Sequence, residues 1–116
     1  MCLTTLIVTQ WQDYGRVHRS RSNLILHLLA VPVFLLANVA LLVELLTGHW
    51  MLAGICLLTM LVGFAAQGLG HAKETERPVA FTGPWNLLVR TFVEQWITFP
   101  RFVLSGGWAS AFKASA

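Results

Sequence analysis

The sequence predicts an all-α integral membrane protein: a transmembrane helical hairpin with an N-terminal and a C-terminal amphipathic helix. Three observations lead to this fold class. Hydrophobic residues make up 56% of the 116 residues and charged residues only 11%, and the mean hydropathy is +0.66. A soluble chain this short cannot bury so much apolar surface, because too much of any small globule stays exposed. Two long runs also carry no charged residue, so we expect a single membrane domain over residues 1–116.

The N-terminal residues 3–18 have the pattern of an amphipathic helix. Apolar and aromatic residues and one histidine recur there at helical spacing: Ile7, Trp11, Tyr14 and His18. We expect this helix to lie along the membrane surface or to pack on other helices. A basic turn at residues 19–23 should follow it, with Ser22 or Asn23 as the N-cap of the next helix.

Two spans are predicted at residues 24–46 and 50–71, since their uncharged stretches reach about the 20 residues needed to cross the hydrocarbon core. The short turn at residues 47–49 makes them a hairpin. Pro32 should kink the first span. Asn38 and Gln67 should form hydrogen bonds between helices. Four glycines of the second span would allow close helix packing: Gly54, Gly63, Gly68 and Gly70.

Basic residues predict the orientation of the hairpin. Three arginines precede the first span, Lys73 and Arg77 follow the second, and the turn between the spans has none. The positive-inside rule therefore places both ends of the hairpin in the cytoplasm. The expected location is a bacterial inner membrane, or the endoplasmic reticulum in a eukaryote. The net charge of +3 does not indicate nucleic-acid binding, because the basic residues are scattered and form no motif.

A further amphipathic helix is predicted at residues 84–99, after the cap-like sequence Thr82-Gly83-Pro84. We expect its aromatic residues to form the buried face. Arg90 and Glu94 should lie on the other face, spaced to pair with each other. Two charges in mid-segment favour a helix lying at the interface over a third span. Pro100 should end this helix, and Gly106-Gly107 should end the ordered part of the chain.

The predicted topology brings three of the four histidines to one depth. His18 ends the surface helix, His27 lies about one turn inside the first span, and His71 ends the second. His49 falls at the opposite face of the membrane. An ionisable residue inside a span usually faces the bundle interior in a functional role. Sequence spacing alone therefore indicates a candidate metal site.

Two polar residues share helix faces with these histidines. Asn23 precedes His27 by four residues, roughly 40° away on a helix, and Glu74 follows His71 by three, roughly 60° away if that helix continues. Three imidazoles, with or without one carboxylate, suit Fe(II) or Zn(II). Asn23 or Glu74 could complete or orient such a ligand set.

Two segments also resemble the signatures of a known family of small membrane proteins. The first is His18-Arg-Ser-Arg-Ser-Asn23-Leu-Ile-Leu-His27, running on to Val31-Pro32, and the second is Gly70-His71-Ala-Lys-Glu74-Thr-Glu-Arg-Pro78-Val-Ala80. The best-known fungal member of this family is an endoplasmic-reticulum dioxygenase that acts on 2-hydroxy fatty acids.

The resemblance implies an Fe(II)-dependent oxygenase. Its metal ligands would be His18, His27 and His71, with Asn23 and Glu74 as further site residues and Glu74 as ligand or base. The implied reaction uses molecular oxygen to shorten a long-chain 2-hydroxy fatty acid by one carbon. A 2-hydroxy acid can chelate iron through its carboxylate and hydroxyl while the acyl tail stays in lipid.

Two other functions remain open from the sequence. His27 and His71 on facing helices could be the two axial ligands of a haem. Alternatively, the protein is a non-catalytic adaptor or lipid-binding subunit in which the histidines only pack or form hydrogen bonds. Because three short helices enclose little volume, a homodimer is one way to complete a site.

Overall fold

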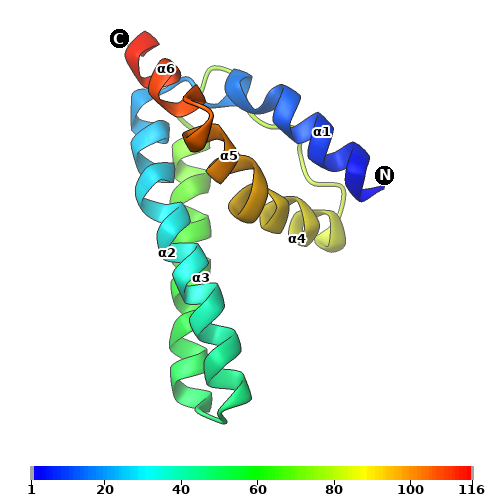
Figure 1. The fold of residues 1–116 in the computed structure, drawn as a ribbon, viewed down its shortest axis with the longest axis vertical. Coiled ribbons are helices and arrows are strands. Elements are labelled where there is room, and N and C mark those ends of the chain that lie inside the picture. The colour runs from blue at the N-terminus through cyan, green and yellow to red at the C-terminus, as the bar shows by residue number, and fades with distance from the viewer. Residues whose placement is uncertain (1, 116) are drawn as a thin grey trace.

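The computed structural model describes residues 2–115, and the chain is all-helical over this range (Figure 1). The elements are α1 (Leu3–Tyr14), the 3-10 turn η1 (Gly15–Val17), α2 (Arg21–Leu46), α3 (Trp50–His71), α4 (Pro84–Val93), the π turn η2 (Glu94–Thr98), α5 (Phe99–Leu104) and α6 (Gly107–Ala114). The predicted all-helical fold, with a hairpin of two long apolar helices, is confirmed.

Helices α2 and α3 form the hairpin and pack along their whole length (Figure 1). Both are long enough and apolar enough to cross a membrane. Gly48 makes the turn between them with a φ of 77°, a left-handed conformation that glycine adopts at little cost. Gly63 and Gly70 face α2, whereas Gly54 and Gly68 face open space. Only two of the four glycines therefore serve the helix contact.

The entry into the hairpin differs from the prediction. Helix α1 ends at Tyr14, so His18 lies in the irregular segment after η1 rather than in a helix. Helix α2 begins at Arg21 with Ser20 as its N-cap, not Ser22 or Asn23. The physical reason is a distant residue: the Glu74 carboxylate accepts hydrogen bonds from the backbone N–H groups of Arg19 and Ser20, which fixes where the helix starts.

The predicted helix break at Pro100 is wrong, because the chain continues as one helical rod through α4, η2 and α5. Pro100 falls in the first turn of α5, where a proline is tolerated, directly after the wider π turn. The predicted pairing of Arg90 with Glu94 is also wrong. The Arg90 guanidinium donates to the carbonyls of Val79 and Ala80 at 2.7 and 3.2 Å, and Glu94 points into the molecule.

The rod also places its side chains differently from the prediction. Trp85 is 76% exposed and Trp96 is 45% exposed, so these aromatic residues face outward. The side buried against the hairpin and α1 carries polar residues instead: Thr91, Gln95 and Thr98. This arrangement suits a helix whose outer face meets lipid and whose inner face meets a polar site.

The chain remains ordered beyond Gly106-Gly107, contrary to the prediction. Gly106, at a φ of 85°, turns the chain into α6, which packs against α2. The indole N–H of Trp108 donates to the Leu24 carbonyl at 2.9 Å. Phe102 lies against the backbone of Gly107, where a Cβ would come within 2.7 Å of its ring. The glycine pair is therefore a packed corner.

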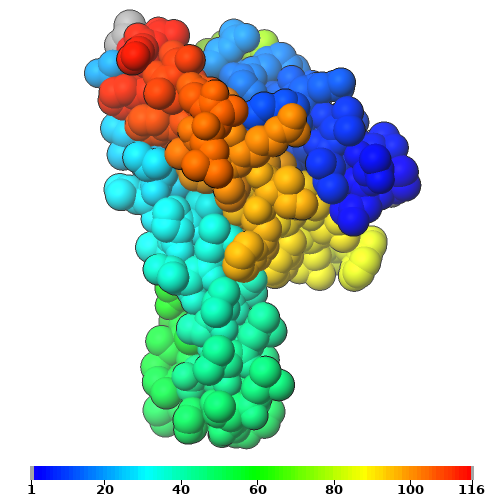
Figure 2. Space-filling model, viewed as in Figure 1, coloured from blue at the N-terminus to red at the C-terminus, as the bar shows by residue number. Residues whose placement is uncertain are grey.

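The molecule has a wide head and a narrow stalk (Figure 2). The stalk is the lower half of the hairpin, with its exposed surface formed by large apolar side chains such as Leu36, Leu46 and Met51. The head contains the main core of buried residues: Tyr14, Leu24, Val31, Phe99 and Phe102. Helices α1 and α4 extend from the hairpin to the same side, next to each other (Figure 1). The histidine-bearing segments meet in this head.

Candidate metal centre

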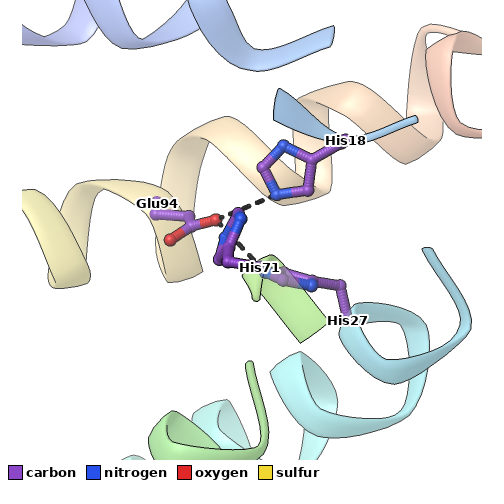
Figure 3. A group of neighbouring side chains, drawn as sticks. All are labelled: His18, His27, His71 and Glu94. Carbon is purple, nitrogen blue, oxygen red and sulfur yellow. Dashed lines mark ion pairs between the residues drawn. The ribbon is translucent and has the colours of Figure 1, made fainter. Parts of the chain in front are cut away.

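Three histidines from three segments meet in the head of the molecule (Figure 3). His18 follows η1, His27 lies in α2 and His71 is the last residue of α3. Their ring centroids are 4.7 Å apart for His18–His27, 4.7 Å for His18–His71 and 4.8 Å for His27–His71. His18 and His27 are almost fully buried. The fold thus brings together the three histidines that the sequence singled out.

Backbone carbonyls fix the orientation of two of these rings. Nδ1 of His18 donates to the Tyr14 carbonyl at 2.8 Å, and Nδ1 of His27 donates to the Asn23 carbonyl at 3.0 Å. Since a carbonyl oxygen only accepts, each Nδ1 carries the proton, and a neutral ring then presents a lone pair at Nε2. Metal-binding histidines are commonly held through their second ring nitrogen in this way.

The nitrogens that face the centre have no hydrogen-bond partner. Nε2 of His18, Nε2 of His27 and Nδ1 of His71 are all buried and unsatisfied. An unpaired buried polar atom costs about 1–3 kcal/mol, and native structures contain few of them. A cation bound among the three rings is one group that could satisfy such atoms together.

A carboxylate completes the group. The ligand atoms of His18, His27, His71 and Glu94 lie within 4.8 Å of one another. Oε2 of Glu94 is 3.6 Å from Nε2 of both His18 and His27. Ligands about 2.1 Å from a metal lie roughly 3.4 Å apart in tetrahedral geometry, so this spacing matches a metal shell. Two neutral rings would turn nitrogen lone pairs toward this carboxylate, an arrangement that a cation between them would relieve. The residues present therefore fit a divalent cation.

Tyr14 holds the carboxylate in place. Its hydroxyl donates to Oε2 of Glu94 at 2.8 Å, and its ring stacks on His18 with the centroids 3.8 Å apart. Burial, with the charge and hydrogen bond of Glu94 adding to it, raises the pKa of Tyr14 well above its usual value. The phenol therefore keeps its proton and remains a donor to Glu94.

The other two predicted site residues, Asn23 and Glu74, lie next to the cluster but are not part of it. Both carboxylate oxygens of Glu74 accept the backbone N–H groups of Arg19 and Ser20 at 3.0–3.1 Å. Oε2 also accepts Nδ2 of Asn23 at 2.7 Å. Asn23 and Glu74 thus link the start of α2 to the end of α3. His49 lies at the far end of the hairpin, as predicted. There its Nδ1 is 2.8 Å from Oε2 of Glu44.

Glu94 and Tyr14 are the residues that sequence reasoning missed. At 100° per residue the helical wheel placed Glu94 on the face opposite the apolar residues. The signal that could have found it was Pro100, which follows within an otherwise helical pattern and favours a local change of helix type. The predicted roles of Asn38 and Gln67 are confirmed, since Asn38 accepts from Trp96 at 3.0 Å and Gln67 pairs with Gln95.

The sequence of the chain also matches a known protein family. The model of the family described as "2-hydroxy-palmitic acid dioxygenase Mpo1-like" matches residues 5–102, a range that contains the three histidines and Glu94. No curated protein and no solved structure matches the chain significantly. The match spans most of the 116 residues and confirms the resemblance seen in the two signatures. The chain belongs to the Mpo1-like family.

Proposed function

We propose that the protein is an Fe(II)-dependent dioxygenase that shortens 2-hydroxy fatty acids by one carbon at a membrane interface. The observation that carries this proposal is the convergence of three unpaired imidazole nitrogens and one carboxylate on one point. The family description supports the substrate class and the use of dioxygen.

Iron suits the proposal better than zinc. Both metals accept imidazole and carboxylate ligands, but zinc has no redox chemistry, which an oxygenase requires. In the proposed enzyme, His18, His27, His71 and Glu94 hold the ion. When bound, iron would supply the activation of dioxygen for cleavage between C1 and C2. The 2-hydroxy acid would chelate it through its carboxylate and hydroxyl.

The surrounding residues would keep this ligand set in place. The Tyr14 and Asn23 carbonyls orient His18 and His27, and the Tyr14 hydroxyl holds Glu94. Glu74 ties the turn that carries His18 to the end of α3 that carries His71. We therefore propose a positioning role for Glu74, and we assign to Glu94 the carboxylate role that the sequence suggested for Glu74.

The substrate class fits the proposed membrane setting. The apolar surface of the hairpin and the outward aromatic face of α4 would lie in lipid. The acyl tail of a fatty acid could then stay in the bilayer while its polar head reaches the cluster. Arginines and a lysine near the head support a cytoplasmic position for the cluster, by the positive-inside rule. All four candidate ligands come from one chain, so the proposal does not require a dimer.

Metal analysis tests the proposal most directly. Protein purified in detergent without metal is loaded with Fe(II) under anaerobic conditions, then supplied with 2-hydroxypalmitate and oxygen, and the products are identified by mass spectrometry. Wild type and His49→Ala should bind one iron per chain and release the acid one carbon shorter. His71→Ala should lose both properties. Absence of bound iron in the wild type, or equal activity in His71→Ala, would contradict the proposal.

Haem binding is a weaker alternative on this geometry. The rings of His27 and His71 are 4.8 Å apart, and His18 and Glu94 occupy the space beside both. This leaves no room for a macrocycle between the two imidazoles. A Soret band in the purified protein would favour haem over the proposed iron site.

A further inference from the structure

The π turn η2 is the segment that delivers Glu94 to the cluster. The backbone N–H of Phe99 donates to the Glu94 carbonyl five residues earlier, the bond that defines a π turn. Pro100 gives a local reason for this wider turn. In an α-helix the Trp96 carbonyl would pair with the N–H of residue 100, which proline lacks.

The wide turn changes which side chains share a face. Residues five apart differ by about 140° on an α-helix and do not face the same neighbour. Glu94 and Phe99 nevertheless both face His27. Oε2 of Glu94 is 3.6 Å from Nε2 of His27, and the Phe99 ring is 6.0 Å from the His27 ring. The π turn therefore lets one helix keep Phe99 in the core while it also aims Glu94 at the histidines.

Side chains from three other helices hold this turn in register. Four of its five residues hydrogen-bond outside the rod: Glu94 with Tyr14 of α1, Gln95 with Gln67 of α3, Trp96 with Asn38 of α2, and Thr98 with Gln10 of α1. The Gln67–Gln95 pair is reciprocal, with N···O distances of 3.0 and 2.7 Å, and it is almost fully buried. A buried pair of amides has few alternative partners, so it fixes the register strongly.

We propose that η2 is a positioning device for the metal centre, in which Gln67 and Gln95 set the register that points the Glu94 carboxylate at the three imidazoles. This inference rests on the proposed function only in taking the cluster as a metal site. It makes Gln67 and Gln95 positioning residues and predicts that an ordinary α turn in this place would remove the carboxylate from the metal shell.

Deleting one residue from the turn tests the proposal. Ile97 lies in η2 and is 41% exposed, so its deletion shortens the turn toward an α-helix without emptying the core. The matched control is Ile97→Ala, which removes most of the same side chain at constant length. The probe is Co(II), added to the detergent-purified full-length protein. The visible absorption spectrum of the bound Co(II) and its binding affinity are measured. Glu94→Gln removes the carboxylate, so its Co(II) spectrum is the reference for a site without this ligand.

The deletion should give the Co(II) spectrum of Glu94→Gln and at least a tenfold weaker affinity, while Ile97→Ala should keep the wild-type spectrum. A wild-type spectrum in the deletion variant would overturn the inference, as would a wild type that binds no Co(II). If wild type and variants behave as expected but no 2-hydroxy acid is consumed, the proposed function fails and the positioning role stands.

A second variant decides the question if the deletion protein does not fold. The double variant Gln67→Leu/Gln95→Leu replaces both amides together. Neither amide is then left buried without its partner, so the double change should be tolerated better than either single change. Far-UV circular dichroism should remain that of the wild type. The Co(II) affinity should fall about tenfold, equivalent to about 1.4 kcal/mol. An unchanged affinity in a folded double variant would refute the role of the amide pair.

Discussion

Gly70 packs against side chains of α2 beside the cluster, and Gly70→Ala should disrupt both the fold and the site. A Cβ at this position would lie 2.3 Å from Oδ1 of Asn23 and 3.3 Å from Cδ1 of Leu26. Asn23 cannot move aside freely, because it is fully buried and its Nδ2 donates to Glu74 at 2.7 Å. The overlap must displace Asn23 or push the two helices apart.

The size of the effect follows from these contacts. Overpacking costs about 1–3 kcal/mol, and losing a hydrogen bond to a carboxylate costs about 1.5–3 kcal/mol. Alanine recovers about 1 kcal/mol of helix propensity relative to glycine. We therefore expect a net loss of about 1.5–5 kcal/mol in the free energy of unfolding for Gly70→Ala.

The matched control is Gly68→Ala, two residues away in the same helix, where a Cβ meets nothing within 4 Å. It should gain up to about 1 kcal/mol from helix propensity. Unfolding is followed by far-UV circular dichroism as SDS is titrated into the detergent-solubilised protein. Co(II) binding should weaken only in Gly70→Ala, because the Asn23 carbonyl also orients His27. Equal stability of the two variants would refute the close-contact reasoning.

Three further predictions concern hydrogen bonds around the cluster. Tyr14→Phe keeps the ring that stacks on His18 but removes the donor to Glu94. The Co(II) affinity should therefore fall by about tenfold to a hundredfold, the usual cost of losing a hydrogen bond to a charged group. An unchanged Co(II) binding isotherm would count against this role of Tyr14. Glu74→Gln should lower the free energy of unfolding by about 1.5–3 kcal/mol, measured by SDS titration, yet keep the wild-type Co(II) spectrum; an altered spectrum would instead identify Glu74 as a ligand. Trp108→Phe should cost about 1 kcal/mol by the same titration, because it loses the bond to α2; the exposed Trp50→Phe is its control, and equal losses in both would contradict this reading.

Long-range regularities made the hairpin and the histidine cluster predictable. An uncharged run of membrane length indicates a span whatever its neighbours are, and a short turn forces two such spans to lie antiparallel. His27 and His71 then reach the same end of the hairpin by topology alone. His18 followed because only a few residues separate it from the first span. No local motif was needed for these three residues.

The side chains whose position or role the sequence did not predict depend on local geometry that periodicity does not contain. A helical wheel assumes 100° per residue, so it cannot place Glu94 beyond a π turn. Glu74 follows the end of α3, where the chain has left the helix, and its direction is set by the N–H groups that it binds. Gly106-Gly107 resembled a chain end because its packing partner, Phe102, is visible only in three dimensions.

The length of α2 has a consequence for the depth of the proposed reaction. Its 26 residues span about 39 Å at 1.5 Å per residue, some 9 Å more than a hydrocarbon layer of roughly 30 Å. His27 is the seventh residue of this helix, about 9 Å from its start. If the far end of the hairpin sits at the opposite boundary, the imidazoles stand level with the glycerol and phosphate groups of the near leaflet. A fatty acid resting in that leaflet would already hold its carboxyl group at their height, so it would have to slide sideways to react and would not have to leave the lipid.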